Sequence, residues 1–278
     1  MRLLVTGASG QLGQALRACL EPRHEVVWTD LEDLDVRDLA GVRGFIGELR
    51  PQGVLHLAAT TQVDACESRP EATYEVNALG TRYVALAAAE AGAELLFIST
   101  DYVFDGLSAR PYLEYDDCVP LNTYGRSKLY GERAVGAILP RHYIVRTSGL
   151  FGPGGRNFVE AILTARQRGD RLRVVRDQVC RPTCAAHLAE ALRRMVGSGN
   201  YGTYHVASTG ETSWFDLARA VLSEAGHDPA AIEPITSAEL QRPARRPAYS
   251  VLDTRAYELT FGHALPNWRE GLRAHLGH

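Results

Sequence analysis

A tyrosine and a lysine stand four residues apart in the segment Tyr124-Gly125-Arg126-Ser127-Lys128. On a helix, this spacing places both side chains on one face. A phenol is a poor acid near neutral pH, and an adjacent ammonium is expected to lower its pKa toward the working range. Such a phenol can protonate or deprotonate an oxygen during hydride transfer. The pattern therefore predicts an acid–base pair of Tyr124 and Lys128.

Lys128 is the only lysine among the 30 basic residues of the chain. The arginine bias is typical of a GC-rich genome and is at best a weak sign of thermostability. A chain that uses arginine everywhere else has nevertheless kept an ammonium here. Arginine holds its proton too tightly to replace a lysine whose charge must be tunable. Composition thus singles out Lys128 independently of the motif.

A glycine-rich loop, Gly7-Ala8-Ser9-Gly10-Gln11-Leu12-Gly13, follows the first apolar run of the chain and leads into a segment with helical spacing. Glycines there allow a tight turn and a close approach to a pyrophosphate, whose charge lies at the helix N-terminus. The loop is expected to contact a dinucleotide through Gly7, Ser9, Gly10, Gln11 and Leu12.

The second predicted strand is closed by Asp30. A carboxylate at this position can accept both ribose hydroxyls of an adenosine, and it repels a 2′-phosphate. Further acidic residues follow, and no arginine appears before Arg37. We therefore expect NADH or NADPH as the cofactor, with NADH mildly favoured. Asp35 and Val36 are expected beside the adenine, with helix capping as the alternative role for Asp35.

Short apolar runs alternate with helical spacing through the first half of the chain. The runs are Leu3–Thr6, Glu25–Thr29, Val54–Ala58, Leu95–Ser99 and Tyr143–Arg146, and the helical segments are Gln11–Leu20, Asp38–Arg50, Glu71–Ala91 and Tyr124–Leu139. This alternation predicts an α/β fold with a Rossmann-type doubly wound parallel sheet over residues 1–148. A smaller, interleaved C-terminal substrate lobe is predicted over 149–278, with Leu172–Val175 and Tyr204–Ala207 returning to the sheet domain.

The composition narrows the class of protein. The 278 residues are 45% hydrophobic and 23% charged, with a formal net charge of −3, which disfavours a nucleic-acid surface. No apolar stretch has the length of a membrane span, and the N-terminus has no secretory apolar region. Five scattered cysteines fit a reducing compartment. We expect a cytoplasmic enzyme that binds neither nucleic acid nor membrane, and a homodimer is left open.

Several longer motifs are similar to those of the dTDP-4-dehydrorhamnose reductase family, within the extended short-chain dehydrogenase/reductases. The most specific is the run Ser99-Thr100-Asp101-Tyr102-Val103-Phe104, followed by Tyr124-Gly125-x-Ser127-Lys128-Leu129-x-Gly131-Glu132. Further matches extend over nearly the whole chain, namely Ala58-Ala59-Thr60, Val63-Asp64, Val76-Asn77-Ala78, Arg146-Thr147-Ser148, Asn157-Phe158, Arg181-Pro182-Thr183 and Arg242-Pro243 through Tyr249-Ser250.

The resemblance implies roles for these residues in reducing the C4 keto group of a nucleotide-linked 6-deoxyhexose, as in dTDP-rhamnose biosynthesis. Tyr124 would be the general acid, Lys128 would hold the nicotinamide ribose, and Thr100 would bind the carbonyl oxygen. Asn77 would support a water relay, with a backbone brace as the alternative. The cofactor contacts would include Ala58, Ala59, Thr60, Asn77, Ser99, Tyr124 and Lys128. The substrate contacts would be Val63, Asp64, Asp101, Tyr102, Tyr124, Asn157, Arg181 and Arg245.

Other readings remain open at this point. Gly149 stands where the family usually has an aromatic residue, so another nucleotide sugar or an epimerase is a variant of the hypothesis. A non-catalytic NADP-binding regulatory subunit of methionine adenosyltransferase is the alternative of a different class. A dehydratase is disfavoured, because Tyr102 stands where that branch needs an acid. A zinc site at Cys180, Cys184 and His187 lacks a fourth ligand, so no metal is expected.

Overall fold

The computed structural model describes residues 1–277, and its centre is a six-stranded parallel sheet. The strand order is β10-β5-β4-β3-β1-β2. The strands are β1 (Arg2–Thr6), β2 (Glu25–Thr29), β3 (Gly53–His56), β4 (Glu94–Thr100), β5 (His142–Thr147) and β10 (Gly202–His205). The order reverses around β1, which has β2 on one side and β3 on the other. The prediction of a doubly wound α/β sheet is confirmed, and ligands of such sheets bind where the order reverses.

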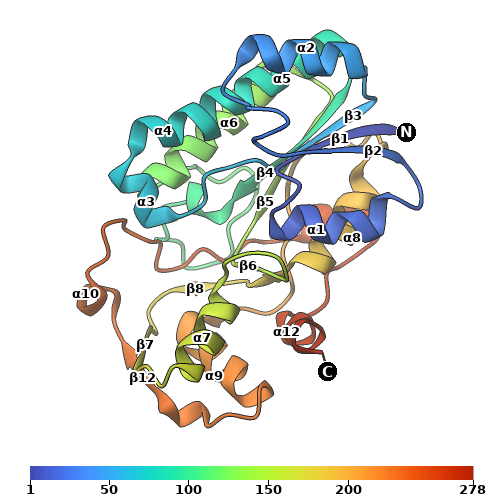
Figure 1. Cartoon of the computed structure of the whole chain (residues 1–278). Coiled ribbons are helices and arrows are strands. Elements are labelled where there is room, and N and C mark those ends of the chain that lie inside the picture. Colours follow the sequence, from blue (N-terminus) through green and yellow to red (C-terminus); the bar gives the residue numbers. More distant parts are fainter. Residues whose placement is uncertain (278) are drawn as a thin grey trace.

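Helices cover both faces of the sheet (Figure 1). On one face lie α2 (Leu39–Leu49), α5 (Thr81–Ala91) and α6 (Thr123–Ile138), and on the other lie α1 (Gln11–Leu20) and α8 (Ala185–Met195). Successive strand residues point to opposite faces, so Leu3 packs with the α1 and α8 side chains Leu16 and Leu188. Leu4 packs with Ile46 of α2 on the other side. Coverage of both faces explains why the strands are continuously apolar.

The expected helix Glu71–Ala91 is interrupted in the structure. Pro70–Tyr74 forms α4, Glu75–Gly80 forms a π-helical turn, and Thr81 then begins α5. Single π-turns of this kind are frequent at functional sites, because they shift the side chains that follow them. A short helix, α3 (Val63–Ser68), precedes them.

A second group of elements lies below the sheet in Figure 1. It contains β6 (Leu150–Phe151), α7 (Phe158–Gln167), β7 (Leu172–Val175), β8 (Val179–Cys180), β9 (Thr183–Cys184), β11 (Thr212–Ser213), α9 (Trp214–Glu224), β12 (Ile232–Ile235), α10 (Ser237–Leu240) and α12 (Trp268–Leu276). An apolar cluster that includes Phe151, Leu217 and Trp268 packs inside it. In contrast, α11 (Arg255–Phe261) packs against β10 and the core of the central sheet. None of the described helices has the length and apolar character needed to cross a membrane.

The two segments expected to return to the sheet behave differently. β10 pairs with β5 and forms an edge of the central sheet. The expectation for Leu172–Val175 is wrong, because β7 pairs in parallel with β12 in a separate two-stranded sheet. Both segments are short and rich in β-branched or aromatic residues, so local pattern does not reveal which partner a strand takes.

Candidate active site

A cleft of about 820 Å³ runs along the carboxyl ends of the strands. Its wall contains residues from the turns after β1, β2, β3 and β4, from α6, and from the C-terminal lobe. Many of the predicted site residues lie on this wall. They are Gly7, Ser9, Gly10, Gln11, Leu12, Asp30, Asp35, Val36, Ala58, Ala59, Thr60, Val63, Ser99, Thr100, Asp101, Tyr102, Tyr124 and Lys128.

One end of the cleft is shaped by the glycine loop between β1 and α1. Gly7 has φ +72, and a Cβ atom there would lie 2.7 Å from the backbone nitrogen of Ala58. This position therefore requires glycine, both for its backbone conformation and for the close approach of the β3 turn. Gly10 precedes α1 without a side-chain cap, so the first-turn N–H groups have no side-chain acceptor from the N-cap. Such a terminus suits an anion.

The acidic end of β2 is less negative than the sequence indicates. Asp30 accepts hydrogen bonds from the backbone nitrogen of Ser9 at 3.0 Å and from its hydroxyl at 3.0 Å. Arg37 lies on the same cleft wall and pairs with Asp35, with 2.7 Å between Nη2 and Oδ2. Hydrogen bonds from Arg37 lower the pKa of Asp35. A guanidinium in the cleft offsets the repulsion of a 2′-phosphate that the acidic residues alone would produce.

At the other end of the cleft, α6 presents Tyr124 and Lys128. The helix begins after Asn122, whose side-chain oxygen accepts from the backbone nitrogen of Gly125 at 2.8 Å and so caps the first turn. Lys128 is 3% exposed, and its Nζ lies 4.1 Å from the centroid of the Phe97 ring on β4. Burial lowers the pKa of Lys128 to about 7, while Glu132 acts in the opposite direction.

The acidity of Tyr124 differs from the sequence expectation. Burial raises the pKa of this phenol, and a hydrogen bond with Thr100 only partly opposes the rise. The expected lowering assumed a fully charged ammonium beside the phenol. Desolvation instead disfavours the charged forms of both groups, so the phenol gains protons and the lysine loses them. Tyr124 is therefore held in its protonated form, which is the form of a proton donor.

Thr100 ends β4 beside this pair, and Asp101 fixes its hydroxyl. The Thr100 hydroxyl donates to Asp101 Oδ1 at 3.1 Å and accepts from the backbone nitrogen of Tyr102 at 3.2 Å. Asp101 also accepts from Ser148 at 2.7 Å and from Ser250 at 2.5 Å. Burial raises the pKa of Asp101 to about 6. Asp101 thus ties the ends of β4 and β5 to the C-terminal segment.

Asn77 occupies the π-helical turn and is fully buried behind the cleft. Its side chain accepts from the backbone nitrogen of Thr60 at 2.8 Å and donates to the Ser127 hydroxyl at 3.0 Å. These contacts match the backbone-brace alternative: Asn77 joins the β3 turn, which lines the cleft, to α6.

Four of the predicted substrate residues are engaged elsewhere and do not belong to the cleft wall. Asn157 caps α7 and donates to Gln11 Oε1 at 3.0 Å. Arg181 donates to the Thr254 hydroxyl at 3.3 Å. The carbonyl of Arg245 accepts from Asn122 at 2.7 Å. Asp64, the fourth, lies on α3 and pairs with Arg242 at 3.0 Å and with Arg246 at 2.9 Å. These ion pairs hold the Pro/Arg-rich segment 242–247 against α3.

The cleft wall also contains residues that sequence reasoning missed, among them Arg37, Arg156 and Trp214. Trp214 begins α9 and stacks at a tilt on Phe158, with 4.7 Å between ring centroids. A Cβ atom at Gly149 would lie 3.5 Å from the Trp214 ring. The aromatic side chain that the sequence lacks at Gly149 is thus supplied by a different element. Gly149, Leu150 and Trp214 all line the cleft, but Trp214 lies 64 residues after Leu150 in the chain. No local motif therefore marks Trp214.

Among the described residues, no group of three or more His, Cys, Asp or Glu side chains could hold a metal ion. The thiols of Cys180 and Cys184 are buried and free. Cys180 ends β8 and pairs with Thr212 of β11, and Cys184 ends β9.

Comparisons with known proteins agree with this geometry. Residues 1–278 match the family model described as RmlD substrate binding domain. A dTDP-4-dehydrorhamnose reductase of Streptomyces griseus is 43% identical and covers 98% of this chain, which in turn covers 91% of that protein. The crystal structure of a dTDP-4-dehydrorhamnose reductase from Clostridium acetobutylicum has a TM-score of 0.96 at 41% identity, over 99% of this chain and 98% of that one. The corresponding protein of Bacillus anthracis, in complex with NADP, also has a TM-score of 0.96, at 36% identity and the same coverage. The chain belongs to the dTDP-4-dehydrorhamnose reductase family.

Proposed function

We propose that this protein reduces the C4 carbonyl of a nucleotide-linked 6-deoxyhexose, with dTDP-4-dehydro-L-rhamnose as the substrate and NADH or NADPH as the cofactor. The observation that carries the proposal is the meeting of Thr100, Tyr124 and Lys128 on one cleft wall with the glycine loop and Asp30. Membership of the reductase family supports it.

The cofactor end fits a dinucleotide. The uncapped first turn of α1 and the glycine at position 7 suit a pyrophosphate, and Asp30 at the end of β2 suits a ribose. A bound nicotinamide cofactor supplies the hydride. Lys128 would hold the nicotinamide ribose, and Ala58, Ala59 and Thr60 would border the cofactor from the β3 side.

The proton chemistry follows from the burial of the catalytic groups. Tyr124 keeps its proton at neutral pH, so its phenol can donate to the oxygen that gains negative charge at C4. On substrate binding, the hydroxyl of Thr100 would turn its one proton from Asp101 to the same oxygen. Lys128 is positively charged below about pH 7 and places that charge beside the phenol. These donors face charge that develops in the transition state.

The substrate end combines the catalytic wall with the C-terminal lobe. Tyr102, Val63 and Trp214 would border the sugar, and the division into cofactor and substrate parts near residue 148 is part of this proposal. Arg242 and Arg246 pair with Asp64, which follows Val63 of the cleft wall, and their guanidinium groups would also serve a diphosphate that extends to this point. Binding energy from the remote nucleotide orients the reacting sugar, so free ketoses should be very poor substrates.

The test is turnover of dTDP-4-dehydrorhamnose by the purified protein with NADH and with NADPH, followed by absorbance of the nicotinamide. Free 6-deoxyketohexoses and other nucleotide ketosugars complete the panel. The proposal expects reduction of the dTDP sugar and little reduction of the free sugar. Tight binding of NAD(P)H without reduction of any nucleotide ketosugar would instead favour the regulatory subunit. A cytoplasmic location and a homodimer remain predictions.

A further inference from the structure

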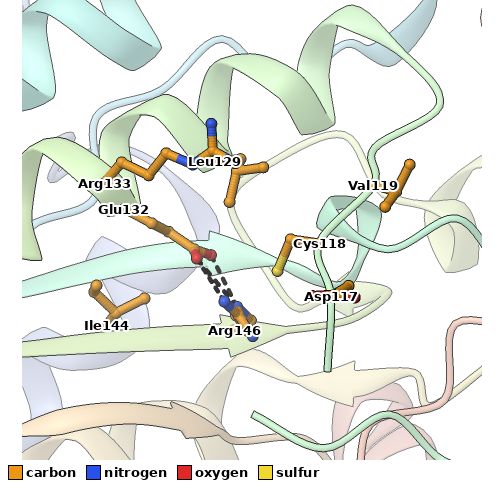
Figure 2. Close-up of a pocket in the computed structure, with 8 residues that line it drawn as sticks. All are labelled: Asp117, Cys118, Val119, Leu129, Glu132, Arg133, Ile144 and Arg146. Carbon is orange, nitrogen blue, oxygen red and sulfur yellow. Dashed lines mark hydrogen bonds and ion pairs between the residues drawn. The ribbon is translucent and has the colours of Figure 1, made fainter. Parts of the chain in front are cut away.

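A buried ion pair lies directly behind the catalytic wall, between Glu132 of α6 and Arg146 of β5. Figure 2 shows the pair among the residues that line a pocket, with dashed lines between the two side chains. The Arg146 side chain donates from Nε to Glu132 Oε1 at 3.0 Å and from Nη2 to Oε2 at 2.7 Å. Both side chains are nearly inaccessible, at 6% and 5% exposure. The pair belongs to none of the roles assigned so far.

The carboxylate of Glu132 touches every element that carries a catalytic group. It sits one helical turn after Lys128 on α6, the helix that also carries Tyr124. Its Oε1 accepts from the hydroxyl of Ser99, at 2.5 Å, and Ser99 immediately precedes Thr100 on β4. Through Arg146 it reaches β5, whose last residue, Thr147, also lines the cleft. One side chain therefore connects α6, β4 and β5 at the level of the reacting groups.

We propose that Glu132 is a positioning residue, which fixes the Tyr124–Lys128 helix against Thr100 and places a carboxylate one helical turn from Lys128. The proposal rests on the proposed reductase function for its activity readout only.

The far side of Arg146 is fully engaged, which makes the pair rigid. Its Nη1 donates to the carbonyl of Glu114 at 3.1 Å and lies 3.4 Å from Nε2 of His205. Burial lowers the pKa of His205 to about 3, so this imidazole is neutral and does not repel the guanidinium. The guanidinium also lies 5.2 Å from the centroid of the Phe104 ring. Apolar residues of similar volume often stabilise a protein as well as such a pair, so stability alone does not account for it.

The electrostatic part of the proposal concerns Lys128. The titratable groups around it are Tyr124 and Glu132 on its own helix and His56 on β3. His56 is fully buried and its pKa is lowered to about 3, so it is neutral at pH 7. Glu132 is the group that raises the pKa of Lys128 against the effect of burial. Removal of its charge leaves the ammonium with the π-face of Phe97 as its remaining electrostatic support.

The experiment compares wild-type protein with Glu132→Gln. The amide keeps the size of the side chain, but it removes the charge and replaces one of the two oxygens that accept from Ser99 and Arg146 with a donor. We expect kcat to fall about tenfold to hundredfold, with KM for both substrates within about threefold. The upper pH limit of kcat should fall by about one unit, because Lys128 loses its proton earlier. Glu132→Asp, which keeps the charge but shortens the reach, should retain the pH limit and lose part of kcat.

The single lysine offers a readout that does not depend on activity. Protein labelled with ¹³C-lysine has one lysine side-chain signal, from Lys128. Titration of that signal should give a lower pKa in Glu132→Gln than in the wild type. If the wild type reduces no nucleotide ketosugar, the proposed function fails, but this titration still decides the inference.

A matched control is Glu94→Gln, at the opposite end of β4. Glu94 is also buried, at 6% exposure, and it accepts from the backbone nitrogen of Gly197 at 2.7 Å, far from the cleft wall. This variant should lose stability but keep the wild-type pH profile. If Glu132→Gln does the same, with an unchanged Lys128 titration, the ion pair is merely structural and the proposal is overturned.

Should Glu132→Gln fail to fold, the double variant Glu132→Leu/Arg146→Met replaces the whole pair with apolar groups, a change that buried pairs often tolerate. We expect it to fold, with lower kcat and a lowered Lys128 pKa. Wild-type turnover and an unchanged titration in the double variant would overturn the proposal equally.

Discussion

The two ends of the cleft differ in the groups that form their walls and in how deeply those groups are buried. At the dinucleotide end, backbone and glycine shape the wall, and charged side chains such as Asp35 and Arg37 are partly exposed and paired with each other. At the catalytic end, Lys128 and Asp101 are each 3% exposed, and burial is the largest cause of their pKa shifts. Shape and dipoles suffice to bind an anion, whereas proton chemistry requires desolvated groups whose pKa values have moved. Substitutions should therefore affect affinity at one end and rate at the other.

The largest effect is expected at the proton donor. Tyr124→Phe keeps the ring but removes the phenol, and kcat should fall by about 10²–10⁴-fold. Binding of NADH, measured by calorimetry, should change little, because the dinucleotide end is untouched. Tyr130→Phe, on the exposed side of the same helix, is the control, with Tyr130 54% exposed. Near-normal turnover of Tyr124→Phe would exclude Tyr124 as the acid.

The pH dependence comes next. The pKa of Lys128 is lowered from its ordinary value to about 7, so the ammonium is present below pH 7 and is lost as the pH rises through that value. We expect kcat for reduction to decline above about pH 7. Lys128→Arg should lower kcat overall and remove this decline, because a guanidinium stays charged. A pH–rate profile of both proteins measures this, and an identical upper limit in Lys128→Arg would assign the decline to another group.

A smaller effect is expected at the end of β2, where the outcome is a change of preference rather than of rate. Asp30→Ala should shift the ratio of kcat/KM toward NADPH by about tenfold, since one repulsive carboxylate is removed. Arg37→Ala should shift it in the opposite direction. Steady-state kinetics with each cofactor tests both. A marked wild-type preference for NADPH that Arg37→Ala abolishes would show that Arg37 outweighs Asp30.

The smallest effect is expected where Asp64 holds the Pro/Arg-rich segment. Partial burial raises the pKa of Asp64, but hydrogen bonds from Arg246 and Arg242 outweigh it and lower the value to about 2. A carboxylate with a lowered pKa stabilises the fold above its unfolded value and loses that contribution as the pH falls toward 2. Asp64→Ala should therefore cost about 1 kcal/mol near neutral pH. The loss, followed by thermal unfolding, should shrink below about pH 4; a constant loss down to pH 2 would contradict the ion-pair explanation.

The sequence could predict the parts of the site that are local in the chain. The glycine loop follows its strand directly, and Tyr124 and Lys128 share one turn of one helix, so spacing alone brings these residues together. The strand ends that carry Asp30 and Thr100 follow from the parallel topology, because all carboxyl ends meet at one edge of the sheet.

The remaining features depend on packing between distant segments. Trp214 reaches the cleft wall from α9, and Ser250 reaches Asp101 from the C-terminal segment. The π-helical turn at Glu75–Gly80 interrupts a stretch with good helical spacing, so periodicity could not reveal it. The sequence also predicts the wrong direction for the pKa shift of Tyr124. The spacing shows that a charged residue is near, but it does not show that the phenol is buried away from solvent.

The late strand β10 has a consequence for synthesis of the protein. β10 covers the outer edge of β5, yet it begins 55 residues after β5 ends. Nascent chains emerge N-terminus first. Until Gly202–His205 have left the ribosome, β5 presents an open row of backbone donors and acceptors to any other extended chain. Slow translation between these strands should thus promote aggregation, and a fragment ending at Ser148 would retain that exposed edge permanently.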